Sequence, residues 1–337
     1  MKYIVCDTPG QLSLREKDMP IYEQGKALLK ITRVGICGTD LHAFQGNQPF
    51  FRYPRILGHE LAAEIVEIGN NKQGLEVGDR VIIMPYISCG SCIACTKGKT
   101  NCCEAISVLG VHEDGGMQEY YTVSPEILVK ANSLTEDEIA LVEPLAIGAH
   151  AVFRARPEEG ETALVIGCGP IGLGLIKQLE LAGANVIAMD VQPSRLGFAT
   201  NIMGINQVIL ADKDSELEIR KLNAGELPTL VFDATGNKTA LEKGIHFMSH
   251  GGSYILVGLY KGDLTFNHPF LHSHETTLLS SRNATMADIL KVKAMLEKGL
   301  FPASAFITHR VHFDDMTDHF ESWTRAETGV IKALVHF

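Results

Sequence analysis

The sequence predicts an α/β protein of two domains, one mainly β and one built on a doubly wound parallel sheet. From Ala163 onward, short β-branched runs recur about every 23 residues and alternate with segments of helical period that end in glycine. This pattern is typical of β-α units with a buried parallel sheet. Before about residue 150, alternating strand patterns are separated by Gly, Pro and Asn loops, with little helical period. A chain of 337 residues suits about two hydrophobic cores.

The mainly β part has strand patterns at residues 26–35, 60–69 and 79–85. Near the C-terminus a helix is expected at 284–299, followed by strand-like segments at 308–313 and 332–337. A tail of this kind can return to complete the first domain. In the doubly wound part, strands are expected near residues 164, 186, 207, 230, 254 and 277, which is enough for a complete sheet of this class.

Composition and charge exclude several classes of protein. The formal net charge is −10 and the sequence has no Lys/Arg run, which argues against nucleic acid as the main partner. The longest apolar run, Ala163 to Ile176, is shorter than the roughly 20 residues that span a bilayer. The start MKYIVCDTPG lacks the features of a secretory signal. We therefore expect a cytoplasmic protein that acts on a small molecule and keeps its cysteines reduced.

A glycine loop follows the first strand of the doubly wound part and opens its first helix. Its residues are Gly167, Gly169, Pro170, Ile171 and Gly172, in a GxGxxG pattern. Such glycines let the backbone approach a pyrophosphate, which the helix N-terminus then binds. A packing role is the alternative for a bare motif, but the flanking strand and helix favour a dinucleotide.

Further residues of the doubly wound part fit the same cofactor. Asp190 ends the second strand and would accept hydrogen bonds from the ribose hydroxyls, which favours NAD over NADP. Arg195 either covers the same ribose or is an ordinary solvated arginine. The ends of later strands, where the cofactor is expected to lie, carry Gly236, Val257, Gly258 and Leu259.

The segment SCGSCIACTKGKTNCC holds five cysteines. Cys89, Cys92, Cys95 and one of the adjacent Cys102 and Cys103 have a spacing that lets one loop surround a tetrahedral zinc ion. Four thiolates leave no open position, so such a zinc is structural. An iron–sulfur cluster and a plain reduced loop are the alternatives.

A second candidate metal site lies in ICGTDLH and LGHE. Cys37, His59 and Glu60 are mixed ligands of the kind that leave a zinc position open for water or substrate. Taken singly, Cys37 is more often a small buried hydrophobe and His59 a core histidine.

Together these motifs resemble the zinc-dependent medium-chain dehydrogenase/reductase family over essentially the whole chain. The resemblance rests on Cys37, Gly58-His59-Glu60, the cysteine segment, Glu143-Pro144 and the glycine loop, in this order. It implies a GroES-like catalytic domain at 1–145 and 285–337, with a structural zinc lobe at about 86–105. It also implies a Rossmann NAD-binding domain at 146–284, an active site in the cleft between the domains, and a homodimer or homotetramer.

The same resemblance assigns roles to individual residues. Cys37, His59, Glu60 and Glu143 are implied ligands of a catalytic zinc, and Cys103 rather than Cys102 completes the structural site with Cys89, Cys92 and Cys95. Asp40 would hydrogen-bond the liganding histidine. Thr39 and His42 match a proton relay. The implied reaction oxidises a zinc-bound alcohol to a ketone, with hydride transfer to NAD.

Within this family, residues 46–60, 107–120 and 280–285 look like those of hexonate 5-dehydrogenases. The preferred reaction is therefore oxidation of L-gulonate to D-fructuronate. L-galactonate, which gives D-tagaturonate, is the runner-up, and another polyol or L-threonine comes next. A zinc- and NAD-binding sensor without activity is the alternative outside enzymes, although it would not need Cys37, Thr39, His42, His59 and Glu60 together.

A hexonate carries a carboxylate, which calls for a cation that makes paired hydrogen bonds. Arg282 is the first candidate and Arg52 the second, although either suits an ordinary solvated position. Asn47, beside Gln48, could line the sugar pocket or belong to a plain surface loop.

Overall fold

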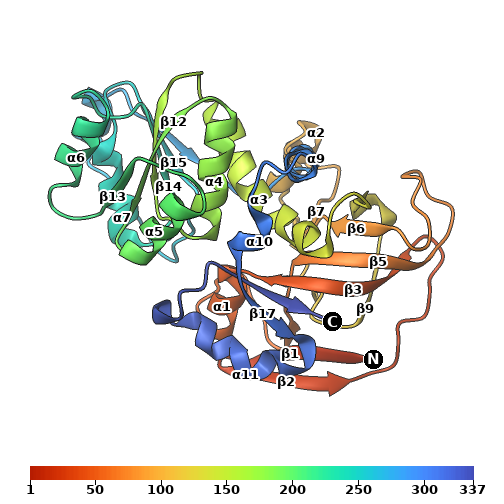
Figure 1. Cartoon of the computed structure of the whole chain (residues 1–337). Helices are drawn as coiled ribbons and strands as arrows, with labels where there is room; N and C mark the ends of the chain where they lie inside the picture. Colours follow the sequence, from red (N-terminus) through yellow and green to blue (C-terminus); the bar gives the residue numbers. More distant parts are fainter. The chain divides into compact units, whose positions relative to one another are not determined.

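The computed structural model describes all 337 residues, which form two compact units (Figure 1). Unit 1 comprises Met1–Glu143 and Ala284–Phe337, and unit 2 comprises Pro144–Asn283. The predicted domain limits, 145/146 and 284/285, lie within two residues of these unit boundaries.

Unit 1 is built on a seven-stranded sheet in the order β10-β6-β5-β3-β18-β17, with β9 paired to β3. The strands are β3 (Ala27–Ile36), β5 (Glu60–Ile68), β6 (Arg80–Ile83), β9 (Tyr120–Val123), β10 (Leu128–Lys130), β17 (Ile307–His312) and β18 (Lys332–His336). Because β18 pairs antiparallel with β3, the C-terminal tail completes the sheet of the first unit. In Figure 1 the blue β17 accordingly lies in the same unit as the red and orange β3 and β5.

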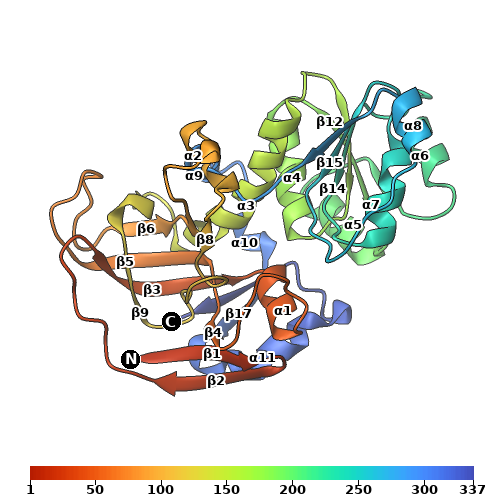
Figure 2. The same ribbon diagram turned by 180° about the vertical axis from the view of Figure 1, so that it is seen from behind.

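Smaller elements surround this sheet. A second sheet has the order β2-β1-β4, as Figure 2 shows, and β7 pairs with β8. These strands are β1 (Lys2–Thr8), β2 (Gln11–Glu16), β4 (Arg55–Ile56), β7 (Tyr86–Ile87) and β8 (Ser107–Val108). The helices are α1 (Gly38–Phe44), α2 (Ile93–Thr96), α9 (Met286–Glu297), α10 (Ala303–Phe306) and α11 (Met316–Phe320). The core includes Leu29, Ile31 and Val34 of β3, all fully buried.

Unit 2 is a parallel sheet in the order β13-β12-β11-β14-β15-β16. Its strands are β11 (Thr162–Ile166), β12 (Asn185–Asp190), β13 (Val208–Leu210), β14 (Leu230–Asp233), β15 (Ser253–Leu256) and β16 (Thr277–Ser280). Its helices include α4 (Pro170–Leu181), α5 (Pro193–Asn201), α6 (Ser215–Leu222), α7 (Lys238–Lys243) and α8 (His268–Ser273). In both views α4 lies on one side of the sheet and α6 on the other. The predicted doubly wound class and its six strands are confirmed, with the change of winding direction between β11 and β14.

One long helix differs from the prediction. The sequence predicts little helix before about residue 150, yet α3 spans Glu136–Ala155 with Pro144 inside it. Its central residues, 139–146, are all buried, so this stretch lacks the alternation of polar and apolar faces that marks a surface helix. No helix of the chain combines the length and apolar character needed to cross a membrane.

Candidate catalytic and cofactor sites

The turn from β3 into α1 positions Cys37. Cys37 is the N-cap residue of α1, and its backbone N–H donates to Asp40 Oδ2 at 2.9 Å. The other carboxylate oxygen of Asp40 accepts from the Gly58 N–H at 3.3 Å. Asp40 is 1% exposed, so a buried carboxylate ties the segment of Cys37 to the segment of His59.

The first residues of β5 bring His59 and Glu60 to the same place. The ligand atoms of Cys37, His59 and Glu60 all lie within 4.8 Å of one another. His59 is 4% exposed and Glu60 is fully buried. Gly35, opposite Glu60 in the sheet, leaves room for its carboxylate, because a Cβ on Gly35 would lie 2.1 Å from Glu60 Oε2.

Lys332 is a member of this cluster that the sequence analysis missed. Its Nζ donates to both oxygens of Glu60 at 2.7 Å and to the Ile36 carbonyl at 3.1 Å, and the residue is 1% exposed. Burial acts to lower the pKa of Lys332, but Glu60 and then Cys37 raise it above its usual value. A lysine at the start of an apolar strand is ordinarily exposed, so the sequence carried no useful signal for this ion pair.

Glu143 reaches the same surroundings from α3. The hydroxyl of Tyr86, on β7, donates to Glu143 Oε1. Burial raises the pKa of Glu143 to about 7, and the electrostatic effect of His59 acts in the opposite direction. Glu143 does not belong to the group of three whose ligand atoms lie within 4.8 Å. Tyr86 was also missed, since a tyrosine in a short strand has no sequence signature of a polar contact.

The predicted hydrogen bond between Asp40 and His59 is not formed. His59 Nδ1 lies 3.8 Å from Asp40 Oδ1, which is too far for a hydrogen bond, and it has no hydrogen-bond partner. The Asp40 carboxylate instead accepts from the backbone N–H groups of Cys37 and Gly58. Burial acts to lower the pKa of His59, but Asp40 and then Cys37 raise it well above its usual value.

A buried imidazole, a thiol and carboxylates form a donor set that fits zinc. Because His59 Nδ1 faces Asp40, Nε2 is the nitrogen available to a metal. A divalent cation would favour the thiolate of Cys37 and the carboxylate of Glu143, which are the forms that bind a metal.

The cysteine segment folds as a compact lobe around α2. Cys89, Cys92, Cys95 and Cys103 have their sulfur atoms within 4.8 Å of one another, whereas Cys102 is exposed and stands outside the group. The Cys92–Cys95 and Cys89–Cys95 sulfur distances are 3.5 and 4.0 Å. Zn–S bonds of about 2.3 Å in a tetrahedron place the sulfurs about 3.8 Å apart, so these four thiols fit one ion.

The lobe favours the thiolate form at Cys89. The backbone N–H of Cys92 donates to Cys89 Sγ at 3.4 Å, and that of Cys89 donates to Cys103 Sγ at 3.2 Å. Hydrogen bonds from the Ser91 and Cys92 backbone lower the pKa of the Cys89 thiol to about 6. Burial acts in the opposite direction at Cys95 and raises the pKa of that thiol to about 11. Zinc binds the deprotonated form, so Cys89 is ready to bind a metal, whereas Cys95 would lose its proton when the metal binds.

In unit 2 the glycine loop has the shape that a dinucleotide requires. Gly167 has a φ of +95°, and a Cβ on Gly172 would lie 1.8 Å from the Gly167 carbonyl oxygen. Gly169 is the N-cap residue and Pro170 the first residue of α4, so the N-terminal N–H groups of a 12-residue helix follow the loop directly. The side chain of Arg195 approaches Gly169, since a Cβ there would lie 2.8 Å from Arg195 Nη1.

The strand ends beside this loop hold the other expected cofactor residues. Asp190 accepts from the Cys168 N–H at 2.7 Å and from the Gln192 N–H at 2.8 Å. The turns after β14 and β15 pack closely, since a Cβ on Gly258 would lie 2.3 Å from the Gly236 nitrogen. Val257 and Gly258 donate their N–H groups to the Asp233 carbonyl, each at 2.9 Å.

The residues expected at the substrate are all exposed. Asn47 and Arg52 follow α1 in unit 1, whereas Arg282 belongs to unit 2. On α1 itself, Thr39 is half-buried and His42 is exposed.

The fold and these sites define a nucleotide-binding enzyme with metal-ligand clusters, and comparison with known proteins identifies its family. Residues 23–133 match the alcohol dehydrogenase GroES-like domain, and residues 170–298 match the zinc-binding dehydrogenase domain. The chain is 41% identical to L-galactonate-5-dehydrogenase of Escherichia coli K12, over 100% of this chain and 99% of that protein. It is 32% identical to L-threonine 3-dehydrogenase of Pyrococcus horikoshii, over 98% and 97%.

Among solved structures, an alcohol dehydrogenase from E. coli CFT073 in complex with NADH is 31% identical, with a TM-score of 0.91 and coverage of 100% and 99%. The chain therefore belongs to the zinc-binding dehydrogenases of the alcohol dehydrogenase type. It is an oxidoreductase of the alcohol/polyol type, with zinc and NAD as cofactors. The predicted family, fold class, enzyme class and cofactors are confirmed.

Proposed function

We propose that the protein oxidises the C5 hydroxyl of a hexonate with NAD, and that L-galactonate is its substrate. Two features support this proposal: the buried cluster of Cys37, His59 and Glu60, and the 41% identity to L-galactonate-5-dehydrogenase along the whole chain. The identity favours L-galactonate over L-gulonate, the epimer that the sequence analysis preferred. L-gulonate stays the second candidate because the two acids differ at one carbon.

In this proposal Cys37, His59 and Glu143 hold the catalytic zinc, which when bound lowers the pKa of a coordinated hydroxyl. Both oxygens of Glu60 accept hydrogen bonds from Lys332, so Glu60 is a reserve ligand that stays beside the metal rather than a permanent one. Asp40 fixes the two segments that carry Cys37 and His59. Cys89, Cys92, Cys95 and Cys103 hold the structural zinc.

The substrate proton leaves through Thr39 and His42. These residues stand three positions apart on α1, so their side chains share one face of the helix. The half-buried Thr39 is the inner member of the pair and the exposed His42 the outer one, which is the order that transfer to solvent requires.

The dinucleotide binds at the glycine loop of unit 2. The pyrophosphate lies on Gly167, Gly169, Pro170, Ile171 and Gly172, where the N-terminus of α4 favours an anion. Asp190, although partly engaged by the backbone, keeps acceptor capacity for ribose hydroxyls, and Arg195 lies beside the same loop. The nicotinamide half of the cofactor contacts Gly236, Val257, Gly258 and Leu259. Arg282, Arg52 and Asn47 bind the hexonate.

The decisive measurement is NADH absorbance with zinc-loaded protein, NAD and a panel of L-galactonate, L-gulonate, L-idonate, sorbitol and L-threonine. We expect the highest kcat/KM with L-galactonate. A higher value with L-gulonate would reverse the choice of epimer. Equal or greater activity on sorbitol or L-threonine would contradict the sugar-acid proposal, and Arg282→Ala would then affect all substrates alike.

A further inference from the structure

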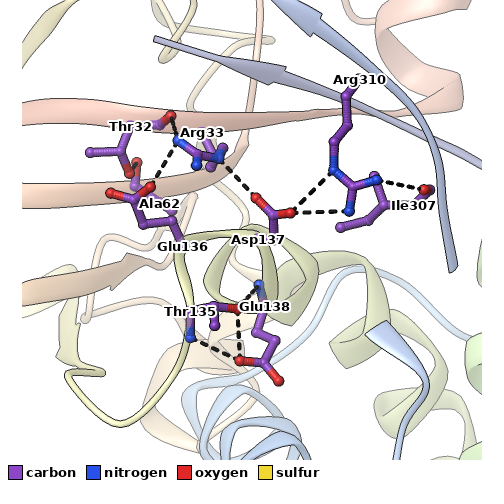
Figure 3. A network of polar contacts seen from close by, with 9 residues as sticks. All are labelled: Thr32, Arg33, Ala62, Thr135, Glu136, Asp137, Glu138, Ile307 and Arg310. Carbon is purple, nitrogen blue, oxygen red and sulfur yellow. Dashed lines mark hydrogen bonds and ion pairs between the residues drawn. The ribbon is translucent and has the colours of Figure 1, made fainter. Parts of the chain in front are cut away.

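We propose that Asp137 is a positioning residue for the catalytic zinc centre, because it bridges Arg33 and Arg310 and thereby joins the elements that carry the metal ligands. Figure 3 shows its carboxylate between the two guanidinium groups. This inference rests on the proposed role of Glu143 as a zinc ligand.

The bridge uses both oxygens of one carboxylate. Asp137 Oδ1 accepts from Arg33 Nε at 2.8 Å. Asp137 Oδ2 accepts from Arg310 Nε at 3.3 Å and from Arg310 Nη2 at 3.1 Å. Asp137 is therefore the shared partner of two cations. Without its carboxylate, the bridge between Arg33 on β3 and Arg310 on β17 would be lost.

Each arginine is also fixed to its own strand. Arg33 Nη1 donates to the Thr32 carbonyl of β3 at 2.7 Å. The same nitrogen lies 2.8 Å from Glu136 Oε2 of α3, a second contact between β3 and α3 that does not involve β17. Arg310 Nη1 donates to the Ile307 carbonyl at 3.1 Å. A planar guanidinium held at one edge presents its other N–H groups in a fixed direction. The bridge therefore constrains the orientation of Asp137 relative to both arginines as well as its distance from them.

The three bridged elements lead to the metal centre from different parts of the chain. Arg33 lies on β3, four residues before Cys37, and Arg310 lies on β17, which pairs with β18. Asp137 lies in the first turn of α3, six residues before Glu143 and hence about 9 Å away along the helix axis. Because β18 begins at Lys332 and lies between β3 and β17, one carboxylate links the supports of Cys37, Lys332 and Glu143.

Helix capping alone does not account for the bridge. Acidic residues favour the first turn of any helix, and α3 has Glu136, Asp137 and Glu138 there. A separate capping box already serves this purpose, since Glu138 Oε2 accepts from the Thr135 N–H at 2.8 Å and Thr135 Oγ1 accepts from the Glu138 N–H at 3.3 Å. The arginine contacts of Asp137 are additional to it, so the two roles can be separated by mutation.

The test compares Asp137→Asn with Thr135→Ala, which breaks the capping box and leaves the bridge intact. Zinc release to a chromogenic chelator is followed in both, and the catalytic phase is identified as the one missing in Cys37→Ser. We expect Asp137→Asn to release the catalytic zinc roughly three to ten times faster, as expected for the loss of a few partly exposed ion pairs. Thr135→Ala should release it at the wild-type rate, and Asp137→Glu should restore part of the loss.

Steady-state kinetics provides a second test of the role of Asp137. Asp137→Asn should lower kcat with the hexonate while the KM for NAD stays unchanged, because the glycine loop belongs to unit 2. In combination with Glu143→Gln, the effect of Asp137→Asn on zinc release should largely disappear. Wild-type zinc release in Asp137→Asn, or equal acceleration in Thr135→Ala, would overturn the inference. A wild-type protein without dehydrogenase activity would instead refute the proposed function, since zinc release is measured independently of turnover.

Discussion

The two candidate zinc sites of unit 1 are built in opposite ways. The structural lobe takes its four candidate sulfur ligands from residues 89–103, a short segment with two short helical turns. The catalytic centre draws on segments from the N-terminal part, the middle and the C-terminal end of the chain and buries most of its members, which are Cys37, His59, Glu60, Glu143 and Lys332.

This difference indicates which interactions stabilise each site. The lobe organises its thiols with backbone N–H groups of the same loop, so the metal is its main cross-link. The catalytic centre stands on the paired strands β18, β3 and β5, and it balances part of its charge with Lys332. Loss of zinc should therefore unfold the lobe locally but leave the framework of the centre intact.

The largest effect should follow removal of a ligand from the catalytic centre. Cys37→Ser replaces a thiolate by a hydroxyl, a much poorer zinc ligand, and should lower kcat/KM by a factor of at least about 10³. The protein should keep one of its two zinc ions and nearly all of its thermal stability. Metal analysis and kcat/KM check this result, with Cys102→Ser as the control. A variant that loses both ions would contradict the independence of the two sites.

The next effect concerns the buried ion pair. Lys332→Met leaves Glu60 buried without its cation, which should destabilise the protein by about 3–5 kcal/mol. Urea unfolding measures this loss. The double variant Lys332→Met with Glu60→Gln should recover much of the stability, because a neutral side chain no longer needs a counter-ion. An unchanged free energy of unfolding in the single variant would show that the pair contributes nothing to the framework.

Replacing a cysteine of the lobe should affect its zinc content and stability only if that cysteine is a zinc ligand. Cys103 is 2% exposed and lies within the sulfur cluster, whereas its neighbour Cys102 is exposed and outside it. Cys103→Ser should remove the structural zinc and destabilise the protein by about 2–3 kcal/mol, as expected for the loss of a metal. Cys102→Ser should retain the zinc content and thermal stability of the wild type. Zinc loss in both variants would mean that the two adjacent thiols share the role.

The same contrast explains how much could be predicted from the sequence. The lobe and the glycine loop lie in short segments, so residue spacing alone indicates their geometry, and the structure brings their members together. The strands of unit 2 are likewise marked by their local apolar runs. The combination of Cys37 with His59 needed the family resemblance, because neither residue is distinctive on its own.

What the sequence missed depends on long-range packing. Lys332 is separated by 272 positions from Glu60, and its burial follows from the pairing of β18 with β3. Tyr86 and α3 were missed for a related reason, since a side chain or helix buried on every side has no polar pattern to identify it. The bond expected between Asp40 and His59 is absent because the two side chains lie 3.8 Å apart, a separation that the sequence does not reveal.

Unit 2 contains a buried carboxylate that can be compared directly with Glu60 of unit 1. Asp233, at the end of β14, is fully buried, and its Oδ2 has no hydrogen-bond partner. Its Oδ1 accepts from Thr235, from the N–H at 2.8 Å and the hydroxyl at 2.7 Å. No lysine neutralises it, and burial raises its pKa to about 6. Glu60 and Asp233 are thus two buried carboxylates, one with a cation and one without.

The smallest effect should be a change in the pH dependence of stability. Because the pKa of Asp233 in the folded state lies above its usual 3.8, the folded protein binds more protons than the unfolded chain between that value and about pH 6. The stability contributed by this group is therefore full below pH 3.8 and falls as pH rises to about 6, by about 3 kcal/mol. Asp233→Asn should remove this part of the slope, as measured by urea unfolding between pH 4 and 6, whereas the exposed Asp263→Asn should leave it unchanged. A slope that persists in Asp233→Asn would mean that Asp233 is ionised despite its burial, and that a buried carboxylate in this fold does not need the cation that Glu60 has.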